Sequence, residues 1–358
     1  MKLYVATRKG LFTLGRGTSG WQIDGVSFLG TPVTTVLPQG ENVWAAVGHG
    51  HFGAKLHRSR DGGRTFAEIP APKYPPRPEG TPDDKDAFGR TIASSLDLIW
   101  TIEGAGGVLW AGTLPGGLFR SKDGGESWEL IRSLWDRPER KQWTGGGYDS
   151  PGIHSIAADG RRLVVAVSCG GIWASDDSAE TWEVQGRGMY NEYMPEEKKF
   201  DPVTQDPHRL SRCAAHPEVM WIQHHNGAFR SVDGGRTVSE IHPQPSKFGF
   251  AVAAHPRDPQ TAFFVPAIKD EFRVPVNGAM VVARTRDGGK SFDVLREGLP
   301  QEHAYHLVYR HGLDIDPTGE ALAMASTTGS LWVSENQGDA WTSVSRDLPP
   351  VYAVRFGN

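Results

Sequence analysis

The sequence predicts an all-β fold, a seven-bladed β-propeller of four-stranded antiparallel blades, as a single domain over residues 1–358. Three observations support this prediction. A ten-residue segment recurs along the whole chain, its copies lie about 50 residues apart, and short strand-like runs separate them. Repeats of about 40–50 residues that are rich in strands are typical of propellers, in which each repeat forms one blade.

The repeated segment has four clear copies and three divergent ones. The clear copies are HRSRDGGRTF (57–66), FRSKDGGESW (119–128), FRSVDGGRTV (229–238) and ARTRDGGKSF (283–292). The divergent copies are WASDDSAETW (173–182), WVSENQGDAW (332–341) and LFTLGRGTSGW (11–21). The first hydroxyl residues of six copies, from Ser59 to Ser334, are separated by 62, 54, 56, 54 and 49 residues. Seven such intervals account for the length of the chain.

Each copy has the chemistry of a tight turn between the third and fourth strands of a blade. Asp and Ser or Thr side chains accept hydrogen bonds from the N–H groups of their own turn, and Gly-Gly supplies positive φ angles. The closing Trp or Phe then packs as an apolar anchor. Because each copy contributes one short acidic side chain that its turn already uses, we interpret the copies as structural turns and not as calcium loops.

The two ends of the chain complement each other. The segment KLYVAT near the N-terminus has the character of a second strand, whereas residues 351–356 have the character of an innermost strand. We therefore expect the C-terminal strand to complete the N-terminal blade, which would leave no open sheet edge in the ring.

Composition excludes several classes of partner. The chain has 38 Lys and Arg against 42 Asp and Glu, a formal net charge of -4, so we expect no nucleic-acid binding. No apolar run approaches the roughly 20 residues of a membrane span, and the start MKLYVATRKG does not resemble a signal peptide. The two cysteines, Cys169 and Cys213, fit a reducing compartment. We expect a cytoplasmic protein that does not bind membranes.

Long irregular segments indicate where a ligand would bind. In a propeller, the loops that enter the innermost strands and those that join second to third strands meet on one face, where ligands bind. The segments that fall in these places are 70–90, 133–152, 185–208, 267–278 and 297–305. Loops of such length are more often functional than accidental.

Several ionisable residues near this face do not recur from blade to blade, so the fold alone does not require them. We assign candidate catalytic roles to His154, His208, His224, Asp149 and Asp206. Candidate ligand-binding residues are Arg273, Arg310, Lys269, Asp270, His225 and His306. Candidate metal ligands are His49, His51, His154, His208 and His224, and the ion would be a divalent transition metal.

Three interpretations of the histidines remain open at this stage. Imidazoles can act as general acids or bases, bind a metal ion, or form hydrogen bonds with backbone carbonyls and water. Cys169, in VSCGG, lies on the same face. It could act as a metal ligand or a nucleophile, or it could be a small buried thiol.

The repeated Ser-x-Asp-x-Gly-x-Thr-Trp pattern resembles the BNR or Asp-box repeat of the sialidase-like propellers, some of which are labelled glycosyl hydrolases. The resemblance covers nearly the whole chain and implies the propeller fold. Its members include enzymes and non-catalytic proteins such as photosystem assembly factors and sorting-receptor ectodomains. Sialidases of this group have an arginine triad and a Phe/Tyr-Arg-Ile-Pro motif before the first box. Here the nearest match, Phe272 to Pro275, lies in the sixth blade, so we do not expect sialidase activity.

The sequence therefore favours a glycosidase-like hydrolase that binds a small polar or sugar-like ligand, including a carbohydrate, at the mouth of the propeller. Two alternatives remain: a metal-dependent enzyme that uses the channel histidines, and a non-catalytic binding or assembly scaffold. The sequence does not name the substrate.

Overall fold

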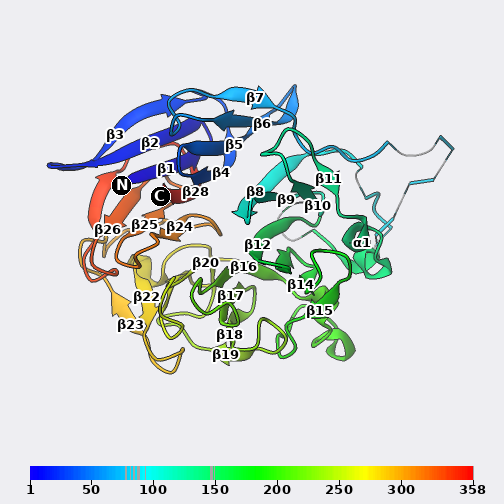
Figure 1. Cartoon of the computed structure of the whole chain (residues 1–358). Coiled ribbons are helices and arrows are strands. Elements are labelled where there is room, and N and C mark those ends of the chain that lie inside the picture. The colour runs from blue at the N-terminus through cyan, green and yellow to red at the C-terminus, as the bar shows by residue number, and fades with distance from the viewer. Residues whose placement is uncertain are drawn as a thin grey trace.

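Seven four-stranded antiparallel sheets form a ring around a central axis (Figure 1). The computed structural model describes residues 1–76, 79–80, 82–83, 85–86, 89–92, 94–145, 148 and 150–357. Within these residues the colour in Figure 1 passes once around the ring, so each blade after the first consists of four consecutive strands. The predicted seven-bladed propeller is confirmed.

In every blade the strands follow one another from the axis outward. Blade one contains β28 (Val351–Gly357), β1 (Lys2–Thr7), β2 (Gly10–Gly17) and β3 (Gly20–Ser27). Blade two contains β4 (Val33–Gln39), β5 (Asn42–His49), β6 (Gly53–Ser59) and β7 (Ala67–Ile69). Blade three contains β8 (Leu98–Ala105), β9 (Val108–Leu114), β10 (Leu118–Ser121) and β11 (Glu129–Leu130). Blade four contains β12 (Ile153–Asp159), β13 (Arg162–Val167), β14 (Gly171–Ser175) and β15 (Glu183–Gln185).

The last three blades follow the same order. Blade five contains β16 (Pro207–Arg212), β17 (Met220–His224), β18 (Gly227–Ser231) and β19 (Ser239–Ile241). Blade six contains β20 (Gly249–Ala254), β21 (Ala262–Pro266), β22 (Val282–Thr285) and β23 (Asp293–Leu295). Blade seven contains β24 (Leu313–Ile315), β25 (Leu322–Ala325), β26 (Leu331–Ser334) and β27 (Thr342–Ser345).

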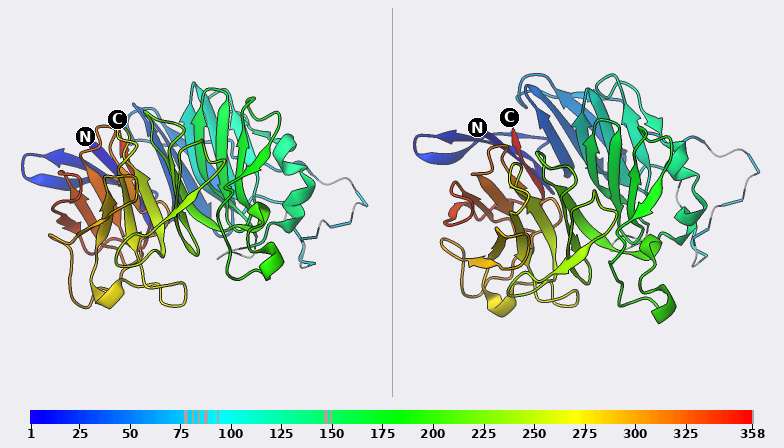
Figure 2. Two further views of the ribbon diagram at one scale, coloured as in Figure 1. Left: turned by 90° about the horizontal axis from the view of Figure 1, so that it is seen from below. Right: turned by 60° about the horizontal axis from the view of Figure 1, so that its bottom comes forward.

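Helical structure is confined to short segments between strands. The described residues include α1 (Arg132–Trp135) and the 3-10 helices η1 (Pro138–Gln142), η2 (Glu196–Lys198), η3 (Pro202–Thr204) and η4 (Val276–Gly278). None of the described helices has the length and apolar character that crossing a bilayer requires. The loops that carry η2 and η4 extend from the same side of the ring (Figure 2).

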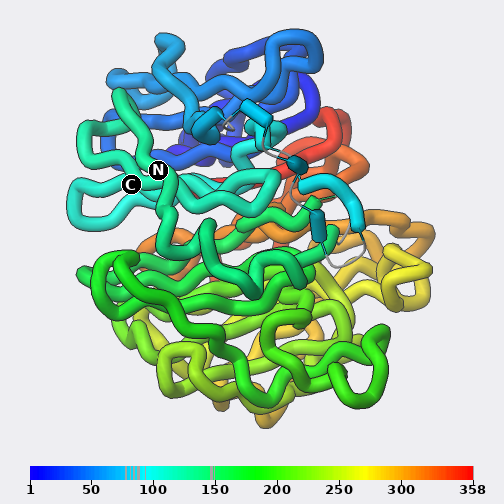
Figure 3. Tube along the Cα trace, turned by 90° about the vertical axis from the view of Figure 1, so that its right-hand side faces the viewer, coloured from blue at the N-terminus to red at the C-terminus, as the bar shows by residue number. Residues whose placement is uncertain are grey.

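The ring closes between the two ends of the chain, as predicted. β28 pairs antiparallel with β1, with Lys2 opposite Gly357 and Val5 opposite Val354. Figure 3 shows the same arrangement from the side, with the red C-terminal segment next to the blue N-terminal blade. This pairing satisfies the backbone groups of β1 that an open sheet would leave without partners.

The hydrophobic core lies between neighbouring blades. At the interface of blades two and three, for example, Leu37 and Trp44 pack in one cluster with Ile99, Ile102 and Phe119. Phe119 is completely buried, and burial of such a side chain contributes about 1.5–3 kcal/mol. Because every strand alternates its side chains between two faces, each sheet supplies one apolar face to each neighbour.

The repeated segments form the expected turns between third and fourth strands. In blade three, the Ser121 hydroxyl donates a hydrogen bond to Asp123 Oδ1 (2.8 Å) and accepts one from the Gly125 N–H (2.8 Å). Asp123 Oδ1 also accepts from the Ser127 N–H (2.9 Å), and Asp123 Oδ2 accepts from the Ser127 hydroxyl. Both carboxylate oxygens therefore serve the turn, which supports the structural interpretation of these segments.

Two of the three divergent copies keep this geometry with other residues. In the copy at 173–182, Ser178 and Ala179 replace the two glycines and still adopt φ angles of 65° and 74°. In the copy at 332–341, Asn336 replaces Asp and accepts the Ala340 N–H at 2.9 Å. The hydrogen-bond pattern of the turn is thus retained where its sequence is not.

We expect Asp123→Asn to destabilise the protein less than Asp123→Ala, because an Asn oxygen can still accept the turn N–H, as Asn336 does. Hydrogen bonds from Ser127 and Ser121 lower the pKa of Asp123 to about 2 from 3.8. A lowered carboxyl pKa contributes stability that is present above the ordinary pKa and is lost as the pH falls toward the lowered one. The melting temperature of wild type should therefore fall more steeply from about pH 4 to 2 than that of Asp123→Asn.

Circular dichroism melts of the two variants across this pH range test the expectation. The matched control is Glu126→Gln in the same turn, where an exposed carboxylate contacts Arg60 only loosely, at 3.8 Å. Equal melting temperatures for Asp123→Ala and Glu126→Gln at neutral pH would contradict the role of the turn.

Candidate functional site

A β-bulge recurs near the start of the innermost strands and directs side chains toward the axis. The pairing register between first and second strands shifts by one extra residue in six of the described blades. The residues at the shifts are Thr34, Trp100, His154, His208, Phe250 with Ala251, and Tyr352. Bulges change the direction of a side chain and are frequent beside active sites.

These bulges border an axial cavity of about 660 Å³. All seven blades contribute to its wall, and every bulge residue just named except His154 and Ala251 lines it. The predicted loop segments 133–152, 185–208 and 267–278 also contribute, whereas the described residues of 70–90 and 297–305 do not. Ligand pockets have volumes of about 300–1,000 Å³, so the cavity has the size expected for a small-molecule site.

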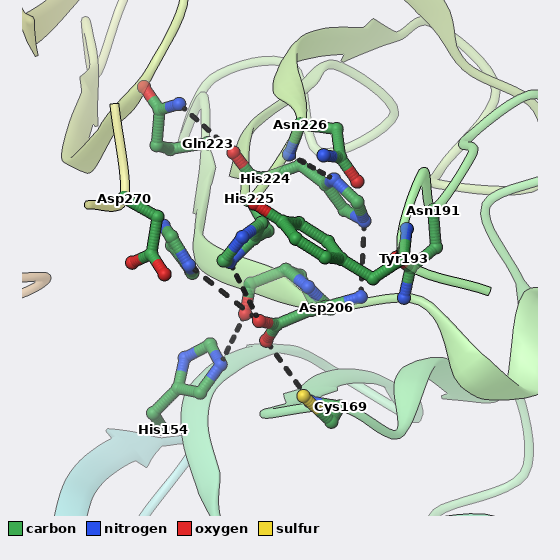
Figure 4. Close-up of polar contacts among 12 residues, drawn as sticks. His154, Cys169, Asn191, Tyr193, Asp206, Gln223, His224, His225, Asn226 and Asp270 are labelled. Carbon is green, nitrogen blue, oxygen red and sulfur yellow. Dashed lines mark hydrogen bonds and ion pairs between the residues drawn. The ribbon is translucent and has the colours of Figure 1, made fainter. Parts of the chain in front are cut away.

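Asp206, His208 and His225 form a cluster in the wall of this cavity. Asp206 Oδ2 lies 3.7 Å from His208 Nε2 and 3.3 Å from His225 Nδ1. Asp206 and His208 are buried, with 7% and 2% of their side chains exposed. Figure 4 shows His225 and Cys169 on two sides of the Asp206 carboxylate. Asp206 and His208 flank Pro207 at the start of β16, and His225 follows β17, so the turn geometry of one blade brings the three together.

Hydrogen bonds fix the two acidic oxygens of Asp206 in different roles. The Cys169 N–H donates to Oδ1 at 3.1 Å, which leaves Oδ2 directed at the histidines. Burial raises the pKa of this carboxyl, but the interactions with His208 and His225 outweigh burial and hold the pKa well below its usual range. Asp206 is therefore ionised at neutral pH.

His208 is held in one tautomer. Its Nδ1 lies 2.7 Å from the carbonyl oxygen of Gly249, so this nitrogen carries the proton and donates. The ring stacks on Phe250, with centroids 4.3 Å apart and planes 7° apart. Burial lowers the pKa of His208, although Asp206 opposes the effect. The neutral ring therefore presents the lone pair of Nε2 to the cavity.

Arg310 supplies a buried positive charge to the same cavity. Its guanidinium lies over the rings of Trp100 and Phe250, 5.1 and 5.4 Å from their centroids. Nε and Nη2 are buried and have no hydrogen-bond partner among the described residues. Burial lowers the pKa of this guanidinium, and the negative charge of Asp206 opposes that effect. A buried charge without hydrogen bonds is costly, so these donors are candidates for binding an anionic group.

Cys169 is a thiol and not a thiolate in this site. It lies at a positive φ of 47° in the turn after β13, and its thiol forms a hydrogen bond with Asp206 (Figure 4). Burial and the charge of Asp206 raise its pKa well above its usual value. The thiol is therefore poorly suited to the nucleophilic role considered from the sequence.

Two of the predicted catalytic histidines do not enter the cavity. His154 Nε2 lies 2.8 Å from the carbonyl oxygen of Pro207, and its Nδ1 lies 3.0 Å from the Ser155 hydroxyl. The two ring nitrogens of His224 face the N–H groups of Asp206 and Asn226, each at 3.1 Å. Burial lowers the pKa of His224 to about 3. Both rings are thus occupied by neighbouring polar groups of the protein, which corrects the sequence prediction for them.

Other predicted site residues also lie outside the cluster. His49 packs on Phe52, His51 lies in the exposed turn that follows, and His306 contacts Thr328 and Trp332. Lys269 pairs with Glu271 at the surface. The predicted metal set of His49, His51, His154, His208 and His224 is therefore corrected, because these side chains belong to separate parts of three blades and only His208 reaches the cavity.

Asp270 and Arg273, predicted to bind the ligand, line the cavity and pair with each other through Arg273 Nε and Asp270 Oδ1 at 2.9 Å. Asp149 lies outside the described residues.

The sequence interpretation missed the aromatic part of the wall, namely Trp100, Phe250, Tyr309 and Tyr352. Three of these four follow a signal that is present in the sequence, the short windows IWTI, GFAV and VYAV at the start of innermost strands. In each window an aromatic bulge residue follows an apolar residue or Gly and precedes a small residue, Thr or Ala.

Comparisons with known proteins support the fold. No family model and no curated protein matches the chain. Among solved structures, a GH74 enzyme of Niastella koreensis is similar over 97% of this chain and 52% of its own, with 15% identity and a TM-score of 0.63. YCF48 bound to D1 peptide is similar over 90% and 85%, with 16% identity and a TM-score of 0.56. A candidate 6-phosphogluconolactonase of Bacteroides uniformis is similar over 99% and 98%, with 14% identity and a TM-score of 0.59.

This chain spans about half the length of the GH74 enzyme. At these identities the similarities establish the propeller architecture alone.

We expect His224→Ala to lower the free energy of unfolding by about 1–3 kcal/mol, because the acceptor nitrogen of this buried ring is lost to the N–H groups of Asp206 and Asn226 that face it. Urea denaturation measures the change. The control His51→Ala removes an exposed ring from a turn and should change stability by less than about 0.5 kcal/mol. A His224→Ala protein as stable as this control would show that His224 is not a structural residue.

Proposed function

We propose that the protein is a hydrolase that binds a small anionic, sugar-like ligand in the axial cavity. The observation that carries this proposal is the juxtaposition in one cavity of Arg310, with two unpaired nitrogens among the described residues, and the Asp206, His208 and His225 cluster. The first group can hold an acidic substituent of a ligand, and the second can act on a water molecule next to it.

The electrostatics of the cavity favour an anion as the bound group. Arg310 is fully charged at neutral pH and nearly inaccessible to solvent, with 8% of the residue exposed. A carboxylate or phosphate that accepts hydrogen bonds from Nε and Nη2 would satisfy both in the planar arrangement that guanidinium favours. The second arginine of the cavity, Arg273, already has Asp270 as a partner. Arg310 is thus the better anchor.

The cluster supports a hydrolytic reaction. His208 offers an unprotonated nitrogen to the cavity, and the ionised Asp206 lies beside it. Both groups can accept a proton from water during attack on an ester, lactone or glycosidic bond. The aromatic rings of Trp100, Tyr309 and Tyr352 also line the cavity and offer surfaces on which a sugar ring can pack.

We expect Arg310→Met to weaken binding of anionic sugar derivatives by roughly 100-fold, because two charge-assisted hydrogen bonds are lost. A panel of sugar lactones, sugar acid esters and aryl glycosides, with acidic and neutral members, should show turnover for acidic members, and the variant should raise KM for these. Lys269→Met is the matched control, since it removes one positive charge from the rim, outside the cavity wall.

The proposal is wrong if no acidic member of the panel is bound or hydrolysed. It is also wrong if Arg310→Met and Lys269→Met behave alike. Binding of peptides without any turnover would instead favour a scaffold.

A further inference from the structure

The cluster of Asp206, His208 and His225 has the composition of a metal centre. The three residues each offer one ligand atom, and these atoms all lie within 4.8 Å of one another. Two imidazoles and one carboxylate are a common ligand set for first-row transition ions, whereas Mg²⁺ and Ca²⁺ prefer oxygen ligands throughout. Among the described residues this is the cluster of His, Cys, Asp and Glu in which three ligand atoms converge.

The distances fit one ion between the side chains. Two ligand atoms that bind one ion at about 2.1 Å with tetrahedral angles lie about 3.4 Å apart. The separations of Asp206 Oδ2 from His225 Nδ1 and His208 Nε2 are 3.3 and 3.7 Å. Both separations start from the same carboxylate oxygen, and the two histidine nitrogens lie within 4.8 Å of each other. An ion near Oδ2 would therefore lie close to all three ligand atoms.

The tautomer of His208 makes a cation at this position favourable. Because Nδ1 donates to the carbonyl oxygen of Gly249, Nε2 of the neutral ring carries a lone pair. That lone pair faces the ionised Asp206 across 3.7 Å, which is too long for a hydrogen bond. A bound ion can bridge this separation, because each of the two atoms can serve as one of its ligands.

The surroundings of the cluster are those of an ordered ligand set. Metal-binding histidines commonly donate their second ring N–H to a backbone carbonyl, as His208 does to Gly249. The Asp206 carboxylate is oriented by the Cys169 N–H at Oδ1. The Nε2 atom of His225 is buried without a hydrogen-bond partner in the part of the chain that the structure describes.

We propose that Asp206, His208 and His225 bind a divalent first-row transition-metal ion, with Zn²⁺ as the best-suited species. Three protein ligands leave a coordination position open to the cavity, which is the arrangement of catalytic and not of structural zinc sites. An ion there would assist the water of the proposed hydrolase, on which this inference depends for its catalytic role, and Arg310 would hold the anionic ligand beside it.

Metal binding is measured without reference to activity. We expect the full-length protein, stripped with chelator and dialysed, to bind one equivalent of Zn²⁺ in calorimetry and one equivalent of Co²⁺ with the appearance of visible absorption. Mg²⁺ should not compete at millimolar concentration. Asp206→Asn and His225→Gln should each weaken Zn²⁺ binding by at least about 100-fold, because each removes one of three ligands.

The matched control is His51→Gln, which replaces an exposed histidine outside the cavity and should leave affinity and stoichiometry unchanged. Circular dichroism melts of the stripped variants verify that each is folded before titration. Absence of Zn²⁺ and Co²⁺ binding by the folded wild type would overturn the proposal. So would undiminished binding by both Asp206→Asn and His225→Gln, or preferential binding of Mg²⁺.

Arg310→Met separates this inference from the proposed function. It should keep the Zn²⁺ affinity and lose the anionic ligand, whereas His225→Gln should lose the metal. If hydrolysis that depends on Arg310 continues in a chelator-treated protein without metal, the metal site is wrong and the hydrolase stands. If Zn²⁺ binds as expected and no acidic compound is bound, the metal site stands and the hydrolase is wrong.

Discussion

Pairing of β28 with β1 is the constraint on which the rest of the structure depends. Once this antiparallel ladder closes the ring, the seven innermost strands are forced to converge on one axis, and residues far apart in the sequence meet there. Trp100, Asp206, Phe250 and Arg310 come from four different blades and line one cavity. The cavity is therefore a property of closure, since no single blade contains all of these lining residues.

The sequence was sufficient for the fold because the information that specifies a blade is local. Each turn such as 121–128 is stabilised by hydrogen bonds within a few residues, and its repetition reveals the number of blades. The site was predicted only in part. Asp206, His208 and Arg310, which break the repetition, line the cavity, but His154 and His224 break it as well and contact polar groups of the protein instead. A residue that departs from the repeat is not required by the blade fold, but this departure does not reveal which groups its side chain contacts.

His154 and His208 show why the sequence could not distinguish a histidine that lines the cavity from one that does not. Both occupy the bulge of an innermost strand, in the windows IHSI and PHRL of adjacent blades. His154 meets the carbonyl oxygen of Pro207 in the next blade, which takes up its Nε2. His208 meets the carbonyl oxygen of Gly249 through Nδ1 instead, and its Nε2 stays directed at Asp206. The two rings differ in which nitrogen meets a carbonyl oxygen of the following blade. This contact joins two sheets, so it could not be predicted from the four-residue sequence around either histidine.

Arg355, a largely covered arginine on an innermost strand, gives an internal comparison for Arg310. Arg355, on β28, contacts the carboxylate of Glu103 and lies 3.9 Å from that of Asp314, and despite burial these carboxylates raise its pKa. Arg310 is more deeply buried, has no such hydrogen bond among the described residues, and its pKa is lowered. The propeller can therefore neutralise a buried guanidinium where only structure requires it. That it leaves Nε and Nη2 of Arg310 without partners among those residues, beside an open cavity, indicates that the missing partner is a ligand.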